Sequence, residues 1–207
     1  VDVIEINMGC PSRQVTGGQS GAALMREPDL ALAIIKATID GAGDTPVTLK
    51  MRLGWDHDCL NAPKIGQAAE EAGVRMLTVH GRTRCQFYKG QADWVAIKPT
   101  VEAVSVPVIA NGDISSIKDA ERALTQSGAD GVMIGRAAMG QPWLPAQIAA
   151  HQEGRTYTVP DLKTQCDSLC EQVEDSLTLY GRSLGLRIVR KHVATSVDTL
   201  DIALPAD

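Results

Sequence analysis

The residue of this chain best suited to chemistry is Cys10, which stands where a predicted strand ends. The apolar run 3–6 has strand character, and it breaks at once into Asn7, Gly9, Cys10 and Pro11. A thiol is mostly protonated at neutral pH, so a cysteine at the end of a strand can donate a proton to a substrate. We therefore predict acid catalysis by Cys10, with a buried structural cysteine and a metal ligand as the alternatives.

Polar residues also follow the other predicted strands, and their types suit a phosphorylated cofactor. Lys50 offers a fixed cation, and His80 offers a ring that can form hydrogen bonds. A second set could hold a phosphate, because glycines let backbone N–H groups approach an anion and an arginine can pair with it. This set consists of Asn111, Gly112, Asp113, Gly135 and Arg136. Gly112-Asp113 or Gly135-Arg136 alone could be an ordinary turn. The recurrence of polar residues at the ends of five predicted strands favours cofactor binding.

The cysteines give no sign of a metal site. Cys166 and Cys170 share one face of a predicted helix, but no second pair and no neighbouring histidine completes a zinc site. We therefore predict that the chain binds no metal. The total of 5 cysteines is odd and lacks the spacing of a small disulfide scaffold, so we expect free thiols in a reducing compartment, the cytoplasm.

Five predicted strands alternate with helices and must position these residues. The strands cover 3–6, 46–52, 76–79, 106–110 and 131–134. Helices are predicted to begin at Pro28, to include 65–72, to cover 93–104 with a break at Pro99, and to include 117–124. This alternation predicts a parallel sheet with right-handed crossovers, whose carboxyl ends meet at one edge. The strands are apolar almost throughout, which predicts burial on both faces.

The α/β units favour a (β/α)8 TIM barrel over an open doubly wound sheet, because they repeat weakly in sequence. Residues 46–50 align with 107–111, and residues 72–80 align with 127–135. Only the last five β/α units are visible, and five parallel strands do not close a barrel. Either the sheet is open, or about three units that would precede Val1 are absent from this chain, and we favour the second.

A separate helical domain is predicted at 147–207, after the barrel part at 1–146. One helix should begin at Pro160, and a second should follow Gly181. Basic residues crowd the second helix, at Arg182, Arg187, Arg190, Lys191 and His192. They predict contact with an RNA backbone, although a solvated helix face would show the same pattern. We expect this domain to be truncated at Asp207.

The composition narrows the classes of function. Hydrophobic residues make up 44% of the 207 residues, which is typical of a folded globular chain. The sequence contains no apolar run of about 18 or more residues, so it predicts no membrane span. The formal net charge of −5 gives no overall attraction to nucleic acid, and any polyanion would need a local basic patch.

Five motifs together resemble those of the tRNA-dihydrouridine synthases, most of all the bacterial branch that contains the B-type enzymes. They are Asn7-Met8-Gly9-Cys10-Pro11, Leu49-Lys50-Met51-Arg52, Thr78-Val79-His80-Gly81-Arg82-Thr83-Arg84, Ile109-Ala110-Asn111-Gly112-Asp113 and Met133-Ile134-Gly135-Arg136-Ala137-Ala138. The motifs occur in the family's order from Val1 to about Trp143, with a looser match beyond. The family's first three strands, which supply further flavin contacts, have no counterpart in this sequence.

The resemblance implies an FMN enzyme with a barrel and a helical tRNA-binding domain, and we expect the chain to be a monomer. NADPH would reduce the flavin, which passes a hydride to C6 of a uracil ring in tRNA, while Cys10 protonates C5 to give 5,6-dihydrouridine. Lys50 and His80 match positions that contact the flavin. The FMN phosphate would be held by Asn111, Gly112, Asp113, Gly135 and Arg136. The residues expected near the substrate base or the RNA backbone are Asn7, Arg82, Arg84, Arg187, Arg190 and Lys191.

Two other hypotheses stay open at the level of sequence. The first is an FMN barrel oxidoreductase that acts on a free pyrimidine, like the dihydroorotate and dihydropyrimidine dehydrogenases, which share the Asn-to-Cys-Pro strand end and the phosphate loops. The second is an inactive fragment, since an open piece of barrel would expose apolar surface. The basic helical domain favours RNA over a free pyrimidine.

Overall fold

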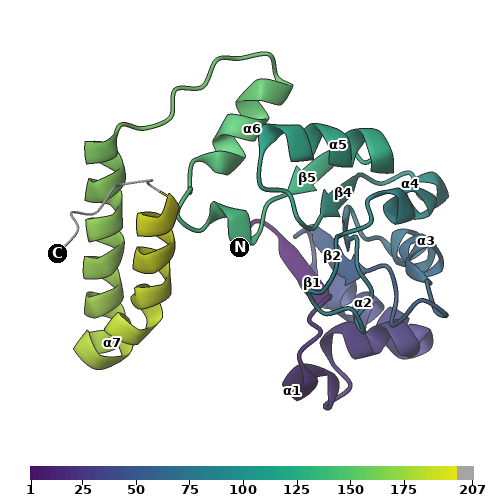
Figure 1. Cartoon of the computed structure of the whole chain (residues 1–207). Coiled ribbons are helices and arrows are strands. Elements are labelled where there is room, and N and C mark those ends of the chain that lie inside the picture. Colours follow the sequence, from purple (N-terminus) through teal and green to yellow (C-terminus); the bar gives the residue numbers. More distant parts are fainter. Residues whose placement is uncertain (200–207) are drawn as a thin grey trace. The chain divides into compact units, whose positions relative to one another are not determined.

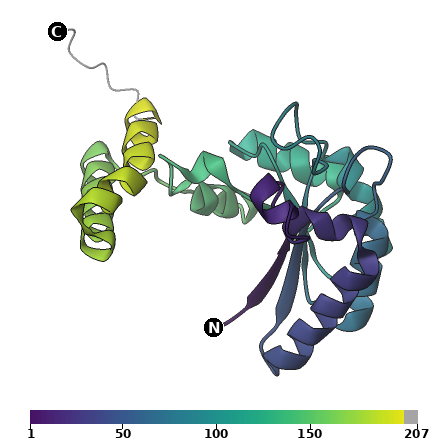
Figure 2. The same ribbon diagram turned by 90° about the horizontal axis from the view of Figure 1, so that it is seen from below.

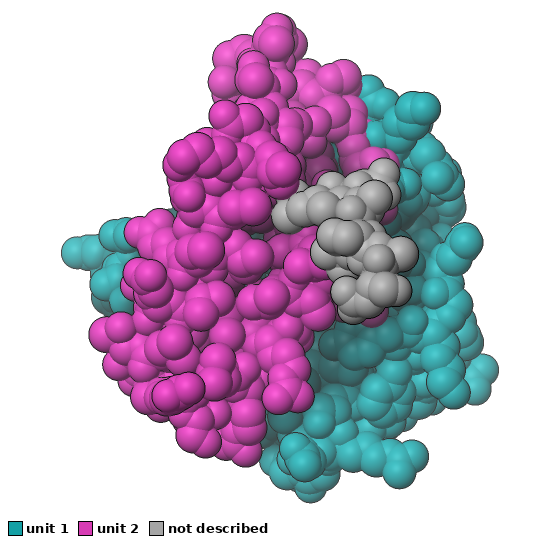
Figure 3. Space-filling view, turned by 60° about the vertical axis from the view of Figure 1, so that its left-hand side comes forward, with its two compact units in different colours: residues 1–114, 118–133 teal, residues 115–117, 134–207 magenta. Residues whose placement is uncertain are grey.

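A computed structural model of the chain describes residues 1–199, which form two compact units (Figure 3). The sheet unit comprises Val1–Ile114 and Lys118–Met133. The helical unit comprises Ser115–Ile117 and the described residues from Ile134 onward. The change of unit thus follows Met133, and the predicted domain boundary after residue 146 stays a prediction.

The sheet unit is built on five parallel strands that are ordered in space as they are in sequence, β1-β2-β3-β4-β5 (Figure 1). The strands are β1 Ile4–Met8, β2 Val47–Arg52, β3 Leu77–His80, β4 Val108–Asn111 and β5 Gly131–Met133. Every neighbouring pair is parallel. The predicted α/β alternation and the parallel sheet are therefore confirmed.

Helices connect the strands and cover one face of the sheet (Figures 1 and 2). The main ones are α2 Pro28–Ala42, α3 Ala62–Ala72, α4 Lys98–Ala103 and α5 Ile117–Ser127. A short helical turn, η2 Val95–Ile97, precedes α4, so the predicted break near Pro99 is confirmed as two short pieces. The segment after β1 contains α1 Arg13–Thr16 and leads into η1 Gly21–Arg26.

The two faces of the sheet differ in polarity. Along β2, Val47, Leu49 and Met51 are buried, and they lie on the face that the helices cover. Side chains alternate along a strand, so Lys50 and Arg52 lie on the opposite face. The predicted burial on both faces is confirmed for most of β2, β3 and β4, whereas β1 and β5 are only partly buried. The second face carries polar groups toward the carboxyl ends of the strands.

The helical unit contains η3 Arg136–Ala138, α6 Leu144–Gln152 and α7 Leu162–Thr199. The α7 segment is two helices, because Gly181 lies between them with φ 73° and ψ 163°, a conformation that glycine adopts readily. The two halves pack together, and a methyl group added at Gly185 would lie 2.5 Å from the carbonyl oxygen of Ser176. The break predicted at Gly181 is confirmed, whereas α6 was not predicted.

Helices long and apolar enough to cross a membrane are absent from residues 1–199. The five cysteines are all unpaired thiols. The expected truncation at Asp207 falls outside the described residues.

Candidate active site

The strand register gathers four of the predicted site residues on the polar face of the sheet. Asn7 pairs with Lys50 across β1 and β2, and His80 pairs with Asn111 across β3 and β4. Lys50 Nζ donates a hydrogen bond to Asn111 Oδ1 at 3.0 Å, and Asn111 Nδ2 donates to the carbonyl oxygen of Met133 at 2.8 Å. Lys50 and Asn111 therefore form one hydrogen-bonded chain over the end of the sheet.

The Lys50 ammonium also lies beside the loop that carries Cys10. A methyl group added at Gly9 would lie 3.9 Å from Lys50 Nζ and 3.7 Å from Asn7 Oδ1, which accepts a hydrogen bond from the Gly9 amide at 2.9 Å. Burial lowers the pKa of Lys50, and the nearby Glu5 carboxylate opposes this shift. Lys50 is thus a partly desolvated cation within the same small region as the thiol loop.

Cys10 is a half-buried, unpaired thiol at the end of β1. Its carbonyl oxygen accepts a hydrogen bond from the Ala22 amide at 3.0 Å. Gly21 packs closely against it, since a methyl group added there would lie 3.1 Å from Cys10 Cβ. The backbone on both sides of the thiol is therefore held by the loop that follows, which leaves its half-exposed side chain as the reactive group.

Arg52, at the end of β2, holds the loops near this thiol through hydrogen bonds to their backbone. It is only 1% exposed, and it donates hydrogen bonds to the carbonyl oxygens of Gly9, Thr83 and Phe87, each at 2.8 Å. Three carbonyl acceptors satisfy a buried guanidinium without a carboxylate. Arg52 therefore fixes the loop after β1 to the loop after β3.

His80 is buried at the end of β3 and is a neutral ring at physiological pH. Burial lowers its pKa to about 3, with further lowering by Arg52, Lys50 and Arg82 and an opposing effect of Asp113. Arg82 Nη1 lies 3.3 Å from His80 Nε2. Because arginine can only donate, Nε2 is the acceptor and the ring proton lies on Nδ1. His80 is thus a hydrogen-bonding group rather than an acid, and its predicted contact with a flavin stays a prediction.

Arg82 and Asp113 form a bidentate ion pair inside the site. Arg82 Nη1 donates to Asp113 Oδ1 at 2.9 Å and Nη2 donates to Oδ2 at 2.5 Å, while Arg82 is 2% exposed. Partial burial acts to raise the pKa of Asp113, but hydrogen bonds from Arg82 and the Ala92 amide outweigh it and lower this pKa. The contacts fix the loop after β3 to the loop after β4. The roles predicted for these two residues at substrate and phosphate stay predictions.

Replacing Gly112 with alanine is expected to destabilise the sheet unit by about 2 kcal/mol. Gly112 has φ +113°, and an added methyl group would lie 2.7 Å from His80 Cδ2 and 2.8 Å from Ala92 Cβ. Gly90→Ala is the matched control, because Gly90 also has positive φ (+64°) but no atom within 4 Å. Urea unfolding measures both, and equal losses in the two variants would show that crowding against His80 contributes nothing.

The remaining predicted residues lie in the helical unit. Gly135 and Arg136, at the start of η3, are exposed. Three exposed basic residues of α7 share one helix face by their spacing of three and four: Arg187, Arg190 and Lys191. The predicted phosphate-binding residues are therefore divided between the two units.

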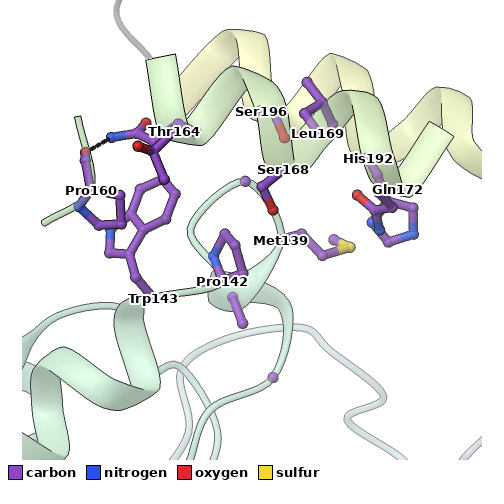
Figure 4. A pocket seen from close by; sticks show the side chains of 14 residues that line it. Met139, Pro142, Trp143, Pro160, Thr164, Ser168, Leu169, Gln172, His192 and Ser196 are labelled. Carbon is purple, nitrogen blue, oxygen red and sulfur yellow. Dashed lines mark hydrogen bonds between the residues drawn. The ribbon is translucent and has the colours of Figure 1, made fainter. Parts of the chain in front are cut away.

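The helical unit also contains a half-open pocket of about 580 Å³ between the segment after β5 and α7 (Figure 4). Met139, Pro142 and Trp143 line one side of it. The α7 side contributes polar groups, among them Gln172 and His192. The pocket thus combines apolar walls with a few hydrogen-bonding groups.

The model of the family described as "Dihydrouridine synthase (Dus)" matches residues 1–204. The chain belongs to the dihydrouridine synthase family. A "Probable tRNA-dihydrouridine synthase" of Rhodobacter capsulatus is 56% identical over 207 residues, which are all of this chain and 64% of that protein. A "tRNA-dihydrouridine synthase B" of Xanthomonas campestris is 44% identical over 192 residues, covering 92% of this chain and 58% of that protein.

The chain therefore spans about three-fifths of the length of the curated relatives it matches. Among solved structures, a 2,3-dimethylmalate lyase of the PEP mutase/isocitrate lyase superfamily aligns with a TM-score of 0.52. The alignment covers 99% of this chain and 85% of that one at 14% identity, and it supports the α/β fold alone.

Sequence reasoning missed two residues that organise the loops after the strands. Arg52 was noted only as part of a motif, yet its position on the same strand face as Lys50, at the end of an apolar strand, could have indicated an interior cation. Trp55 was not singled out, and it contacts the guanidinium groups of Arg26 and Arg84. These contacts join three loops that are distant in sequence.

Proposed function

We propose that this chain carries the uracil-reducing site of an FMN-dependent tRNA-dihydrouridine synthase of the cytoplasm. The observation that carries the proposal is the cluster of Lys50, Asn111 and Asn7 beside the Cys10 loop, in a chain that the family matches over residues 1–204. We further propose that the sheet is five-eighths of a (β/α)8 barrel and that the protein acts as a monomer.

The polar face of the sheet fits a bound flavin. Thr78, which pairs with Lys50 in register, is 1% exposed, and its Oγ1 is buried with no hydrogen-bond partner. Lys50 supplies N–H donors, and the neutral His80 ring supplies one more. A flavin ring system carries both acceptors and donors at its polar edge, so these groups match its chemistry. We propose that Asn111 and Gly112, in the loop after β4, contact the FMN phosphate, and the assignment of Asp113, Gly135 and Arg136 to it stays a prediction.

When bound, reduced FMN, replenished by NADPH, would supply the hydride for C6 of the uracil. The chain's own residues do the rest. The Cys10 thiol holds the proton that C5 receives, and the backbone contacts of Gly9 and Ala22 keep this thiol in place. Lys50 and Asn7, within reach of the same loop, orient the base and the cofactor edge.

A tRNA substrate fits the exposed basic face of α7. Arg187, Arg190 and Lys191 can each contact a phosphate, and such contacts bind RNA without reading its sequence. The target uridine must leave its stack to reach the Cys10 thiol, and the energy of backbone contacts offsets the cost of unstacking. The family match favours this polymeric substrate over a free pyrimidine.

The test is FMN uptake by the purified chain, followed by visible absorption, with the full-length Rhodobacter capsulatus relative as positive control. We expect a flavin band, and about 10- to 100-fold weaker FMN binding after Lys50→Met, which removes a charge-assisted donor. Lys64→Met, on the exposed surface of α3, is the matched control and should bind like the parent chain.

Each result of that experiment is decisive. A band in the relative but none in this chain would make the chain an inactive fragment. Equal binding by the Lys50→Met and Lys64→Met variants would overturn the assignment of Lys50. A band together with dihydrouridine in incubated tRNA and NADPH would establish the activity.

A further inference from the structure

Guanidinium and aromatic groups stack together in the loops that follow β1, β2 and β3. The Cζ atom of Arg26 lies 3.9 Å from the ring centre of Trp55, and the Cζ atom of Arg84 lies 4.5 Å from it. Arg84 also lies 4.8 Å from the ring centre of Phe87. We call these four residues the guanidinium stack. Cation–π contacts of this kind hold both guanidinium groups in defined positions.

Both arginines of the stack keep their positive charge uncompensated. Within residues 1–199, neither Arg26 nor Arg84 forms an ion pair with a carboxylate. Arg26 is exposed, and Arg84 is half-buried with Nη2 donating to Thr16 Oγ1 at 3.0 Å. The Nε atom of Arg84 is buried without a partner. Two ordered guanidinium groups with spare donors are a site for an anion, above all a phosphate.

The stack belongs to the same loops as the thiol. Thr16 is in α1, the short helix that follows Cys10 and Pro11. Arg52 fixes Gly9 and Phe87 to one guanidinium group, so the thiol loop and the stack share a buried anchor. The anion site therefore lies on loops that Arg52 and the Arg84–Thr16 hydrogen bond fix to the loop carrying Cys10.

We propose that Arg26 and Arg84 bind the RNA backbone next to the uridine that reaches Cys10, with Trp55 as the platform that orders them. This inference rests on the proposed function and adds a second RNA contact, on the sheet unit, to the basic face of α7. Extruding a base requires the flanking phosphates to be held while stacking is lost. The chain has a net charge of −5, so such local cations must supply this attraction.

The experiment measures binding of an unmodified tRNA transcript by fluorescence anisotropy over a series of salt concentrations. Arg26→Gln and Arg84→Gln should each weaken binding about 5- to 10-fold and reduce the salt dependence by about one phosphate contact. Arg122→Gln is the matched control, because Arg122 also stacks on a tryptophan, at 5.3 Å from the Trp94 ring, but on α5. This control should bind tRNA like the parent chain.

Folding and FMN uptake separate the outcomes. Variants that keep the parent's thermal midpoint and flavin band but lose tRNA affinity would support the stack, and Arg84→Lys should restore the salt dependence. If Arg26→Gln and Arg84→Gln bind like Arg122→Gln, the stack is not an RNA site, although the proposed function stands. If the parent chain itself binds no tRNA while the full-length relative does, RNA binding by this chain fails as a whole, and the stack proposal fails with it.

Discussion

Replacing Cys10 with alanine is expected to lower the rate of dihydrouridine formation in tRNA by about 10²- to 10⁴-fold, the usual contribution of a positioned general acid. FMN binding should be unchanged, because the contacts made by the Cys10 backbone and by its neighbour Gly9 survive the substitution. The measurement is single-turnover dihydrouridine formation with pre-reduced flavin, which isolates proton donation from the earlier reduction by NADPH.

Cys85→Ala is the control for that experiment. Cys85 is an exposed thiol in the loop after β3, so its removal tests for a general effect of losing a thiol near the site. We expect it to react at the parent rate. Equal rates for the parent and the Cys10→Ala variant would assign the proton to another group and leave Cys10 as a structural residue.

The second large effect is expected from Asp113→Ala, which should reduce the free energy of unfolding by about 3 kcal/mol. Arg82 is 2% exposed, so the substitution leaves a buried guanidinium without its carboxylate. The Ala92 amide loses its acceptor as well. Urea unfolding followed by tryptophan fluorescence measures the loss, since Trp94 in this unit donates a hydrogen bond to Gly112.

Glu102→Ala is the matched control for the buried pair. Glu102 forms an ion pair with Lys98 at 3.7 Å in the same unit, but both side chains are more than half exposed. Exposed pairs contribute little, so this variant should stay within about 0.5 kcal/mol of the parent chain. Similar losses of unfolding free energy in both variants would show that the burial of Arg82 does not determine how much the Asp113→Ala substitution destabilises the chain.

The order and type of the main elements could be predicted because they depend on local patterns. The strand of apolar residues that ends at Asn7, the helix that begins at Pro28 and the break at Gly181 all have short-range signals. The proximity of Lys50 and Asn111 could also be predicted from the sequence, because the carboxyl ends of parallel strands lie at the same edge of the sheet.

The contacts that organise the site could not be predicted in this way. The pair of Arg82 and Asp113 joins residues 31 apart in sequence, and Arg52 reaches three carbonyl oxygens in two different loops. No periodicity encodes such partners, since they depend on how loops fold over the sheet. The same holds for Trp55, whose neighbours Arg26 and Arg84 come from separate loops.

The strand order has a consequence for synthesis on the ribosome. Each strand from β2 to β5 pairs with the one that precedes it in sequence. Translation proceeds from the amino end, so the strand with which each new strand pairs has already been synthesised. The time before each new strand can pair is therefore set only by the rate of translation. A pause after any β/α unit leaves a narrower sheet of the same architecture, rather than a strand waiting for a partner that has not yet been made.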